Sequence, residues 1–281
     1  MTRGEPHAIG SLVVRYFFPR TLHSRRETIA PAVLSPSTEF RSPKSYARLY
    51  SGDSTITHFF TSRLRIIREL IHDHEGGKVL DVGCGPGMLV NELAPRNRVV
   101  GLDLSQDMIQ ECAASLRDSG SIFLNGNAED LPLQDGTFDV VVGAGVLEYA
   151  ADVDKALGEF SRVAKKGGMV IVSMLNGMSP YRLWERTCWD LAQSISRKLR
   201  GRPVPHHDEV HLLSERKLRG LVESNGLKVA RVVYYDFNLF LPPLDKYMPR
   251  RAVAINRRIE RFSGNYLKWI GTGFIVAAQK P

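Results

Sequence analysis

The chain has 281 residues, a formal net charge of +8, 43% hydrophobic residues and 24% charged residues. This composition is typical of one large globular domain with elaborations, and no apolar run approaches the roughly 20 residues of a membrane-spanning helix. Three scattered cysteines, Cys84, Cys112 and Cys188, argue against a disulfide framework or a zinc site and favour a reduced cytoplasm.

The positive charge is unevenly distributed. Acidic side chains outnumber basic ones from Lys78 to Lys166, so the basic excess lies in the first 50 residues, in 181–219 and in 240–270. Such basic flanks either meet an anionic partner or keep the protein soluble, and the sequence leaves both open. We expect no signal peptide, because Arg15 interrupts the apolar stretch SLVVRYFFP and no small-residue cleavage site follows it.

The N-terminal part predicts an arm followed by a helix. Residues 1–57 form the predicted arm or lid, and their first 40 or so are rich in Pro, Ser and Arg without a long hydrophobic period. Next, HFFTSRLRIIRELIHDH places Phe60, Leu64, Ile67 and Ile71 at helical spacing, and Gly76-Gly77 ends that helix.

From residue 78 onward, short apolar strands alternate with helices. Strands are predicted at 78–82, 98–104, 121–125, 138–145, 169–175, 227–235 and 273–280. Helices are predicted at 88–94, after the N-cap Ser105, at 152–168 from the N-cap Asp152, and at 214–226 from the N-cap Ser214. Near-continuous apolar runs between helices are typical of parallel sheets. The predicted fold class is therefore α/β, a doubly wound, mostly parallel seven-stranded sheet of Rossmann-like type.

Two long insertions interrupt the late part of this domain, which spans 58–281. They lie at about 175–213 and 236–270, after late strands, where ligand-covering loops are usually placed. The second contains its own helical stretch, RAVAINRRIERF. We expect these helical lid insertions to cap a substrate site.

The stretch VLDVGCGPG, Val79 to Gly87, predicts a ligand-binding turn at the end of the first strand. Its G-x-G-x-G spacing departs from the dinucleotide pattern G-x-G-x-x-G, and no Lys-Ser/Thr pair of a phosphate-binding loop follows. A carboxylate at Asp81 suits an ammonium group, and Asp103, at the end of the second strand, suits both hydroxyls of a ribose. An amino acid joined to a ribose describes S-adenosylmethionine.

Four motifs in order carry a family resemblance: VLDVGCGPG, VVGLDLSQDMI, NGNAEDLPLQDGTFDVVV and EFSRVAKKGGMVIVSM. The chain resembles the class I S-adenosylmethionine-dependent methyltransferases, in the branch similar to the ubiquinone and menaquinone methyltransferases. The resemblance is strong over about 58–174. It implies a Rossmann-like methyltransferase fold, and S-adenosyl-L-methionine as cofactor with S-adenosyl-L-homocysteine as product.

The resemblance also assigns cofactor roles by position. Asp81 and the turn would line the methionine part, Asp103 would hold the ribose, and Leu104 and Met108 would flank the adenine, although Met108 is equally consistent with plain core packing. The residues that the resemblance places at the cofactor are Tyr50, Asp81, Gly83, Cys84, Gly85, Gly87, Asp103, Leu104, Met108, Asn127, Ala128, Glu129 and Gly145. Tyr46 and Tyr50, in the arm, are expected to close over it. No metal site is predicted.

Two departures from the family pattern affect the chemistry. Asn127-Ala128 stands where relatives usually have Asp-Ala, so the adenine amino group would meet an amide oxygen without charge. Glu148 and Tyr149 stand where a histidine often follows the fourth strand. The candidate catalytic residues are therefore Tyr149, with Glu148 beside it, and the histidines of the first insertion, His207 and His211, near His206.

The insertions also bear on the acceptor. Aromatic and aliphatic side chains such as Trp184, Trp189, Phe237, Phe240 and Leu241 lie near Arg250, Arg251, Arg257 and Arg258. This combination favours O- or C-methylation of a hydrophobic small molecule such as a quinone, isoprenoid, lipid or polyketide-like metabolite, with peripheral membrane contact through the basic insertions.

Other interpretations stay open at this point. The aromatic side chains could simply pack the lid onto the sheet. An RNA or protein methyltransferase fits the pI of about 9.5, although no RNA-binding module is present. A non-catalytic cofactor-binding protein is the third possibility, and the sequence leaves the oligomeric state open.

Overall fold

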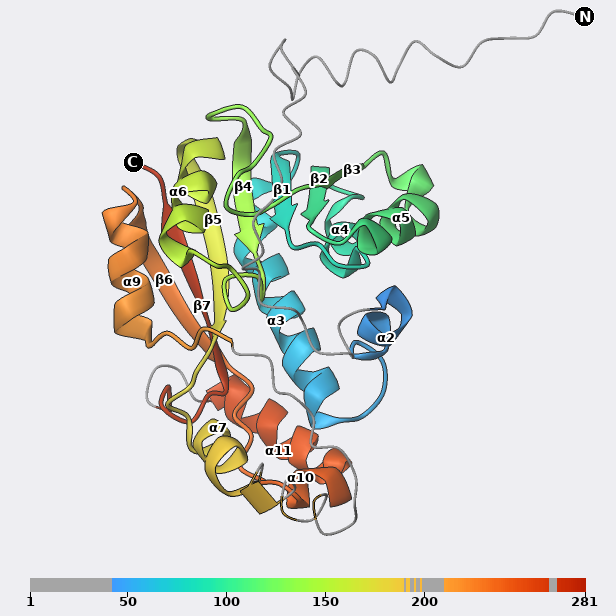
Figure 1. The fold of residues 1–281 in the computed structure, drawn as a ribbon, viewed down its shortest axis with the longest axis vertical. Coiled ribbons are helices and arrows are strands. Elements are labelled where there is room, and N and C mark those ends of the chain that lie inside the picture. The colour runs from blue at the N-terminus through green and yellow to red at the C-terminus, as the bar shows by residue number, and fades with distance from the viewer. Residues whose placement is uncertain (1–41, 190, 193–194, 196–197, 199–209, 263–266) are drawn as a thin grey trace, which may run out of the picture.

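The computed structural model describes residues 42–189, 191–192, 195, 198, 210–262 and 267–281 (Figure 1). Most of the predicted arm, together with His206 and His207, lies outside these described residues.

A seven-stranded sheet with the order β3-β2-β1-β4-β5-β7-β6 forms the centre of the described structure. Neighbouring strands are parallel, except that β7 is antiparallel to both β5 and β6. The strands are β1 Lys78–Val82, β2 Arg98–Asp103, β3 Ile122–Asn125, β4 Phe138–Gly143, β5 Ala164–Leu175, β6 Lys228–Tyr235 and β7 Gly273–Gln279. The predicted α/β, mostly parallel sheet is confirmed. The strand order reverses between β1 and β4, and ligands of such sheets bind beyond the carboxyl ends at that point.

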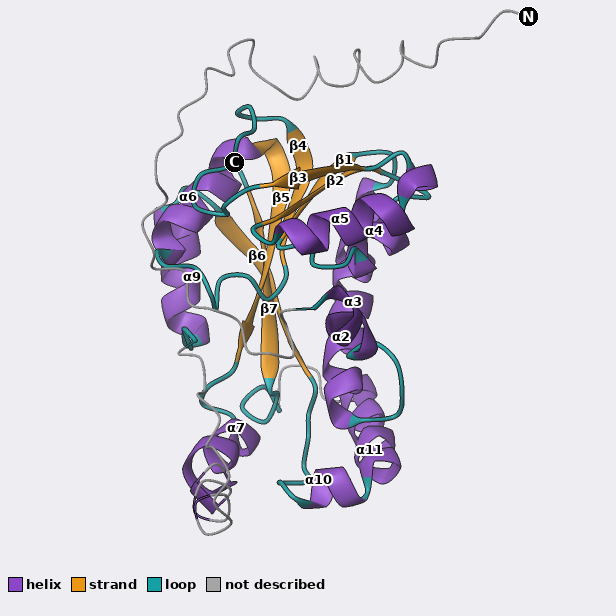
Figure 2. Cartoon of the chain, turned by 45° about the vertical axis from the view of Figure 1, so that its right-hand side comes forward, coloured by secondary structure: helices purple, strands orange, loops and turns teal. Residues whose placement is uncertain are grey.

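Helices cover both faces of the sheet (Figure 2). On one face, α3, α4 and α5 pack over a core that includes Ile67, Val90 and Cys112. On the other face, α6 and α9 contribute Leu157 and Leu218 to a second core. The helices are α2 Pro43–Arg48, α3 Thr55–Ile71, α4 Met88–Leu93, α5 Gln106–Ser115, α6 Val153–Val163, α7 Pro180–Trp184, α9 Glu215–Ser224, α10 Leu244–Tyr247 and α11 Pro249–Phe262, with short helical turns at His72–His74, Arg117–Ser119 and Glu185–Trp189.

Local capping signals place the helix starts where the sequence predicts them. The side chains of Ser105, Asp152 and Ser214 accept hydrogen bonds from the backbone N–H groups three residues later. These bonds satisfy donors that the first turn of a helix leaves free. The predicted N-caps are confirmed.

The predicted end of the helix beginning at Asp152 is wrong. The helix stops at Val163, and Ala164 is already extended and paired with Phe138 of β4. The N–H of Gly167 donates to the carbonyl of Lys280 at 2.7 Å, so pairing with the far end of the chain draws this segment into β5. The prediction places the stop at Gly167-Gly168, but the helix ends before Ala164 because this segment pairs with residues distant in the sequence, which local patterns do not reveal.

The two predicted insertions lie at the same end of the molecule, where β5 and β6 end (Figure 2). The first contains α7, and the second contains α10 and α11. They are joined directly, because Trp184 Nε1 donates to the Pro242 carbonyl at 2.9 Å and Tyr181 donates to Asp245 at 2.8 Å. The described parts of the two insertions therefore form one structure beyond the carboxyl ends of the strands.

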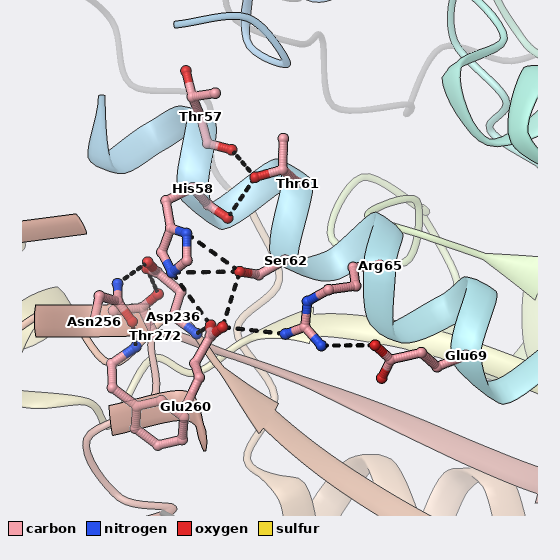
Figure 3. Close-up of polar contacts among 11 residues, drawn as sticks. Thr57, His58, Thr61, Ser62, Arg65, Glu69, Asp236, Asn256, Glu260 and Thr272 are labelled. Carbon is pink, nitrogen blue, oxygen red and sulfur yellow. Dashed lines mark hydrogen bonds and ion pairs between the residues drawn. The ribbon is translucent and has the colours of Figure 1, made fainter. Parts of the chain in front are cut away.

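A buried polar network fixes α11 to α3 (Figure 3). Glu260 accepts hydrogen bonds from Ser62 at 3.2 Å and from the N–H of Asp236 at 2.9 Å. It also pairs with Arg65 at 3.2 Å and with His58 Nε2 at 3.4 Å. Because Ser62 bonds directly to Glu260 as well as contacting the His58 ring, the three groups are not ordered as a nucleophile, base and acid. The network has a structural role.

Asn256 extends this network under the second insertion. Its amide donates to Asp236 and accepts from the N–H of Phe237 at 2.7 Å, while Thr272 donates to the same Asp236 carboxylate. Asp236 has a positive φ of 55° and is 4% exposed, so these bonds hold an uncommon backbone conformation at the start of the insertion.

Candidate active site

The glycine turn after β1 is held against β2. The N–H groups of Gly83 and Cys84 both donate to the carbonyl of Leu102, at 2.7 and 3.0 Å. Gly83, Gly85 and Gly87 all have positive φ, between 53° and 86°, a conformation that other residues rarely adopt. The turn therefore needs its glycines for backbone reasons.

The members of the turn have different neighbours. A Cβ on Gly85 would lie 3.5 Å from the Tyr46 ring, so Gly85 faces this tyrosine of α2. A Cβ on Gly87 would lie only 2.7 Å from Leu116, which assigns Gly87 to close packing against α5. The buried Cys84 lines the same cavity as Tyr46.

Asp103 lies at the end of β2 and faces the turn. Its two carboxylate oxygens each accept one backbone hydrogen bond at 2.8 Å, from Gly85 and from Ser105. Burial raises the pKa of Asp103, and these two bonds oppose the rise. Each carboxylate oxygen can accept a further hydrogen bond. The carboxylate is thus fixed in position with capacity for two hydroxyl donors, as a ribose diol requires.

Asp81 lies at the end of β1 and is 2% exposed. Burial, with a smaller contribution from Asp103, raises its pKa to about 8, and Arg63 opposes the rise. A buried carboxylate with so high a pKa gains strongly from a cationic partner. An ammonium group of a ligand would supply that charge.

Arg63 is the site residue that our sequence reasoning missed. It projects from α3, is 6% exposed, and its guanidinium lies 4.9 Å from the centre of the Phe60 ring and 3.5 Å from the Tyr50 hydroxyl. A Cβ on Gly145 would collide with Arg63 Nη1, so Gly145 leaves room for this cation. The sequence pattern could have indicated its burial, because Arg63 falls on the same side of the predicted helix as Phe60 and Ile67.

The end of the predicted arm covers this cavity. Tyr46 and Tyr50 on and after α2 pack on Phe60 with ring centroids 5.7 and 5.2 Å away. Together with Arg63, Asp81 and Gly83, both tyrosines line a cavity at the carboxyl end of β1. The structure therefore brings the predicted Tyr50 together with Asp81 and the glycine turn.

The residues predicted around the adenine lie beyond Asp103. Leu104 is 45% exposed and Met108 is buried. The amide oxygen of Asn127 already accepts the N–H of Glu129 at 3.1 Å, leaving one lone pair for a ligand. Glu129 itself accepts from the N–H of Ala151 at 2.7 Å, a bond that holds the segment before α6. Ala128, between them, is buried.

Of the predicted catalytic residues, Glu148 and His211 lie together at the end of the sheet. Glu148 is 4% exposed, and one of its oxygens accepts the N–H of Leu175 at 3.2 Å. Burial raises the pKa of Glu148 to about 7, against the opposing effects of Arg63 and Arg182. His211 is brought to Glu148 by a backbone hydrogen bond of 2.9 Å.

The other two predicted catalytic residues receive less support. Tyr149 is half-buried beside Glu148 and is absent from the lining of the cavity beneath α2. His207 lies outside the described residues, and its role stays a prediction. Among the residues that the structure describes, no group of three or more His, Cys, Asp or Glu side chains could hold a metal ion. Nor does any helix of the described segments have the length and apolarity to cross a membrane.

Comparison with known proteins defines the class. Residues 80–172 match the family described as "Methyltransferase domain". The fold, the site and this match place the chain in the family of S-adenosylmethionine-dependent methyltransferases, and S-adenosylmethionine is the cofactor of this family.

The chain is similar to particular members of this family. It is 30% identical over 186 residues to a ubiquinone biosynthesis O-methyltransferase from Bartonella quintana, covering 65% of this chain and 71% of that protein. It is 36% identical over 109 residues to a demethylmenaquinone methyltransferase from Symbiobacterium thermophilum, covering 36% of this chain and 43% of that protein.

A solved structure supports the fold. A methyltransferase from Thermotoga maritima, described as a possible histamine N-methyltransferase, superposes with a TM-score of 0.58 at 20% identity, covering 86% of this chain and 98% of that one. The resemblance found in the sequence is confirmed.

Proposed function

We propose that this protein transfers a methyl group from S-adenosylmethionine to an oxygen or carbon atom of a hydrophobic small-molecule acceptor, of the quinone, isoprenoid, lipid or polyketide-like class. The observation that carries the proposal is the cavity at the end of β1, where Asp81, Arg63 and Tyr50 meet beside Asp103. Names of the relatives support the acceptor class, since two of them act in ubiquinone and menaquinone methylation.

The residues of the cavity fit the chemical parts of the cofactor. Asp103 would accept the ribose hydroxyls, Asp81 would pair with the ammonium group, and Arg63 would pair with the carboxylate. Tyr46 and Tyr50 would exclude water above them. When bound, the cofactor supplies a methyl group already activated by a sulfonium.

The protein then has to position the acceptor. Orientation of two reactants can contribute on the order of 7–11 kcal/mol at best. The joined insertions, 175–213 and 236–270, serve in this proposal as the cap over the acceptor. Phe59 and Tyr235, whose ring centroids are 5.1 Å apart, supply an apolar wall on the side of α3.

The test begins with calorimetric titration of S-adenosylhomocysteine into the purified chain. We expect binding that Asp103→Asn weakens and that Glu223→Asn, on the exposed surface of α9, leaves unchanged. Transfer of labelled methyl groups into lipid and metabolite extracts is then compared with transfer into RNA and protein. No binding of S-adenosylhomocysteine would refute the cofactor assignment, and labelling of RNA or protein alone would refute the acceptor class.

A further inference from the structure

Three strands bring a glutamate and a tyrosine together at the carboxyl end of the sheet. Leu175 of β5, Gly273 of β7 and Tyr235 of β6 are paired in one row. A Cβ on Gly273 would lie 2.7 Å from the Tyr235 hydroxyl, so the missing side chain lets this ring lie across β7. Glu148 is bound to the N–H of Leu175 at the β5 end of that row.

Buried polar atoms in this region lack hydrogen-bond partners within the described residues. They are Glu148 Oε2, the Tyr235 hydroxyl and Arg182 Nε. Glu148 is 4% exposed and Tyr235 is 1% exposed. Since buried polar atoms are almost always hydrogen-bonded, such a group of atoms indicates a place where a ligand completes the bonding.

Two cations border the same place. The guanidinium of Arg182 lies 5.6 Å from the centre of the Phe59 ring, and that of Arg63 lies 5.8 Å from it. The Tyr235 ring packs on the same Phe59, so one aromatic ring contacts both arginines and the tyrosine. Arg182 is also paired with Glu185 at 2.8 Å.

We propose that this cluster binds an acidic hydroxyl group of the acceptor, of the phenol or enol class, and that Glu148 removes its proton. The inference rests on the proposed methyl transfer and names the chemistry of its acceptor. A carboxylate acceptor is already ionised and would be repelled by Glu148. An aliphatic alcohol is too weak an acid for a carboxylate base.

The acceptor's O–H bond breaks, and its proton moves to Glu148 Oε2. The oxygen's electron pair forms the bond to the methyl carbon while the methyl–sulfur bond breaks and its electron pair returns to sulfur. Arg182 and the Tyr235 hydroxyl stabilise the oxygen anion. The pKa of Glu148, about 7, suits a base that works near neutral pH.

The test uses 4-nitrophenol as the probe, bound to the protein saturated with S-adenosylhomocysteine. The proposal requires the phenol oxygen and Glu148 to share one proton, because the site cannot hold both as anions. Above about pH 8 the wild-type complex must take up a proton, so its dissociation constant should rise about tenfold for each pH unit. Glu148→Gln needs no such proton, and its dissociation constant should not rise.

Two controls keep the outcomes distinct. Glu223→Gln on the surface should behave as wild type, and nitrobenzene, which lacks the hydroxyl, should bind without pH dependence. Equal pH profiles for wild type and Glu148→Gln, or no binding of 4-nitrophenol to the wild type, would overturn the inference. Because S-adenosylhomocysteine binding is measured first, its absence would instead overturn the proposed function.

The second insertion carries a positively charged surface on helix α11. Helix α11 buries Ala252, Val253 and Asn256 and exposes arginines on its opposite side. The exposed arginines are Arg250, Arg251, Arg257, Arg258 and Arg261. Of these five, Arg250 alone forms an ion pair with another described residue, Asp53 at 3.2 Å. The helix thus presents a positive face that the described structure does not neutralise.

Exposed apolar side chains lie next to this face. Tyr247 is 79% exposed and Leu244 is 51% exposed, both on α10 immediately before α11. Leu239, Leu183 and Trp184 are also exposed, and the Trp184 bond to Pro242 keeps α7 against this segment. Apolar side chains beside unpaired arginines are typical of helices that lie in the surface of an anionic bilayer.

We propose that α10 and α11 dock on an anionic lipid surface. In co-sedimentation with vesicles, the full chain should bind phosphatidylcholine containing phosphatidylglycerol and not phosphatidylcholine alone. Arg251→Gln and Arg258→Gln should each weaken binding about fivefold, and Leu244→Ser with Tyr247→Ser should weaken it further. Lys166→Gln is the matched control, because Lys166 lies at the end of β5 away from the insertions, and it should leave vesicle binding unchanged.

Two outcomes would overturn the membrane proposal. One is that the chain binds neutral and anionic vesicles equally well, or binds neither. The other is binding to RNA that competes fully with the vesicles and depends on the arginines but not on Leu244 and Tyr247.

Discussion

Replacing Asp81 with asparagine should stabilise the ligand-free protein at alkaline pH. The pKa of Asp81 is about 8 in the folded protein, against an ordinary value of 3.8. Between these two values the folded state keeps a proton that the unfolded chain has released, so stability is lost as the pH rises through this window. Above about pH 8 the loss levels off, because both states are then ionised.

The magnitude follows from the size of the pKa difference. At 1.36 kcal/mol for each pKa unit, the difference in the free energy of unfolding between Asp81→Asn and wild type should grow by about 4 kcal/mol between about pH 5 and pH 9. Urea unfolding of both proteins without cofactor measures it. Glu148 and Asp236 also have raised pKa values, but they titrate in both proteins and cancel in the difference.

Asp81→Asn should also abolish the stabilisation of the protein by S-adenosylhomocysteine. The amide cannot pair with an ammonium group as the carboxylate can, so S-adenosylhomocysteine should raise the melting temperature of the wild type and not of Asp81→Asn. Parallel pH profiles of stability for the two proteins, or a variant less stable than wild type at pH 9, would refute the assignment of Asp81 as a strained, ligand-dependent carboxylate.

The remaining predictions concern three other positions. Asp103→Asn should raise the dissociation constant of S-adenosylhomocysteine about 10- to 150-fold in calorimetry, since hydrogen bonds to a charged group contribute about 1.5–3 kcal/mol; an unchanged constant would contradict the ribose role. Gly145→Ala should reduce the thermal stabilisation by S-adenosylhomocysteine because its Cβ displaces the buried arginine, whereas Gly136→Ala, which also has a positive φ but open space around it, should not. Asn256→Ala should lower the free energy of unfolding by about 2–5 kcal/mol in urea, because two buried partners including Asp236 lose hydrogen bonds; a loss below about 1 kcal/mol would show that the network is dispensable.

The sequence alone was sufficient for the sheet, the helix starts and the cofactor class. Strand periodicity and N-caps such as Ser105 depend on residues a few positions apart. The pairing of Asp81 and Asp103 near the glycine turn follows from one general rule, that parallel strands end at the same edge of the sheet. These features could be predicted without coordinates.

Only the tertiary structure decided which charged side chains share the site. Arg63 lies on a predicted apolar stripe, and nothing local shows that Gly145 leaves space for its guanidinium. The Tyr235 ring lies across β7 toward the end of β5, where Glu148 accepts the N–H of Leu175, because Gly273 has no side chain in its way. Contacts across such distances in sequence depend on strand order and register, which residue spacing does not encode.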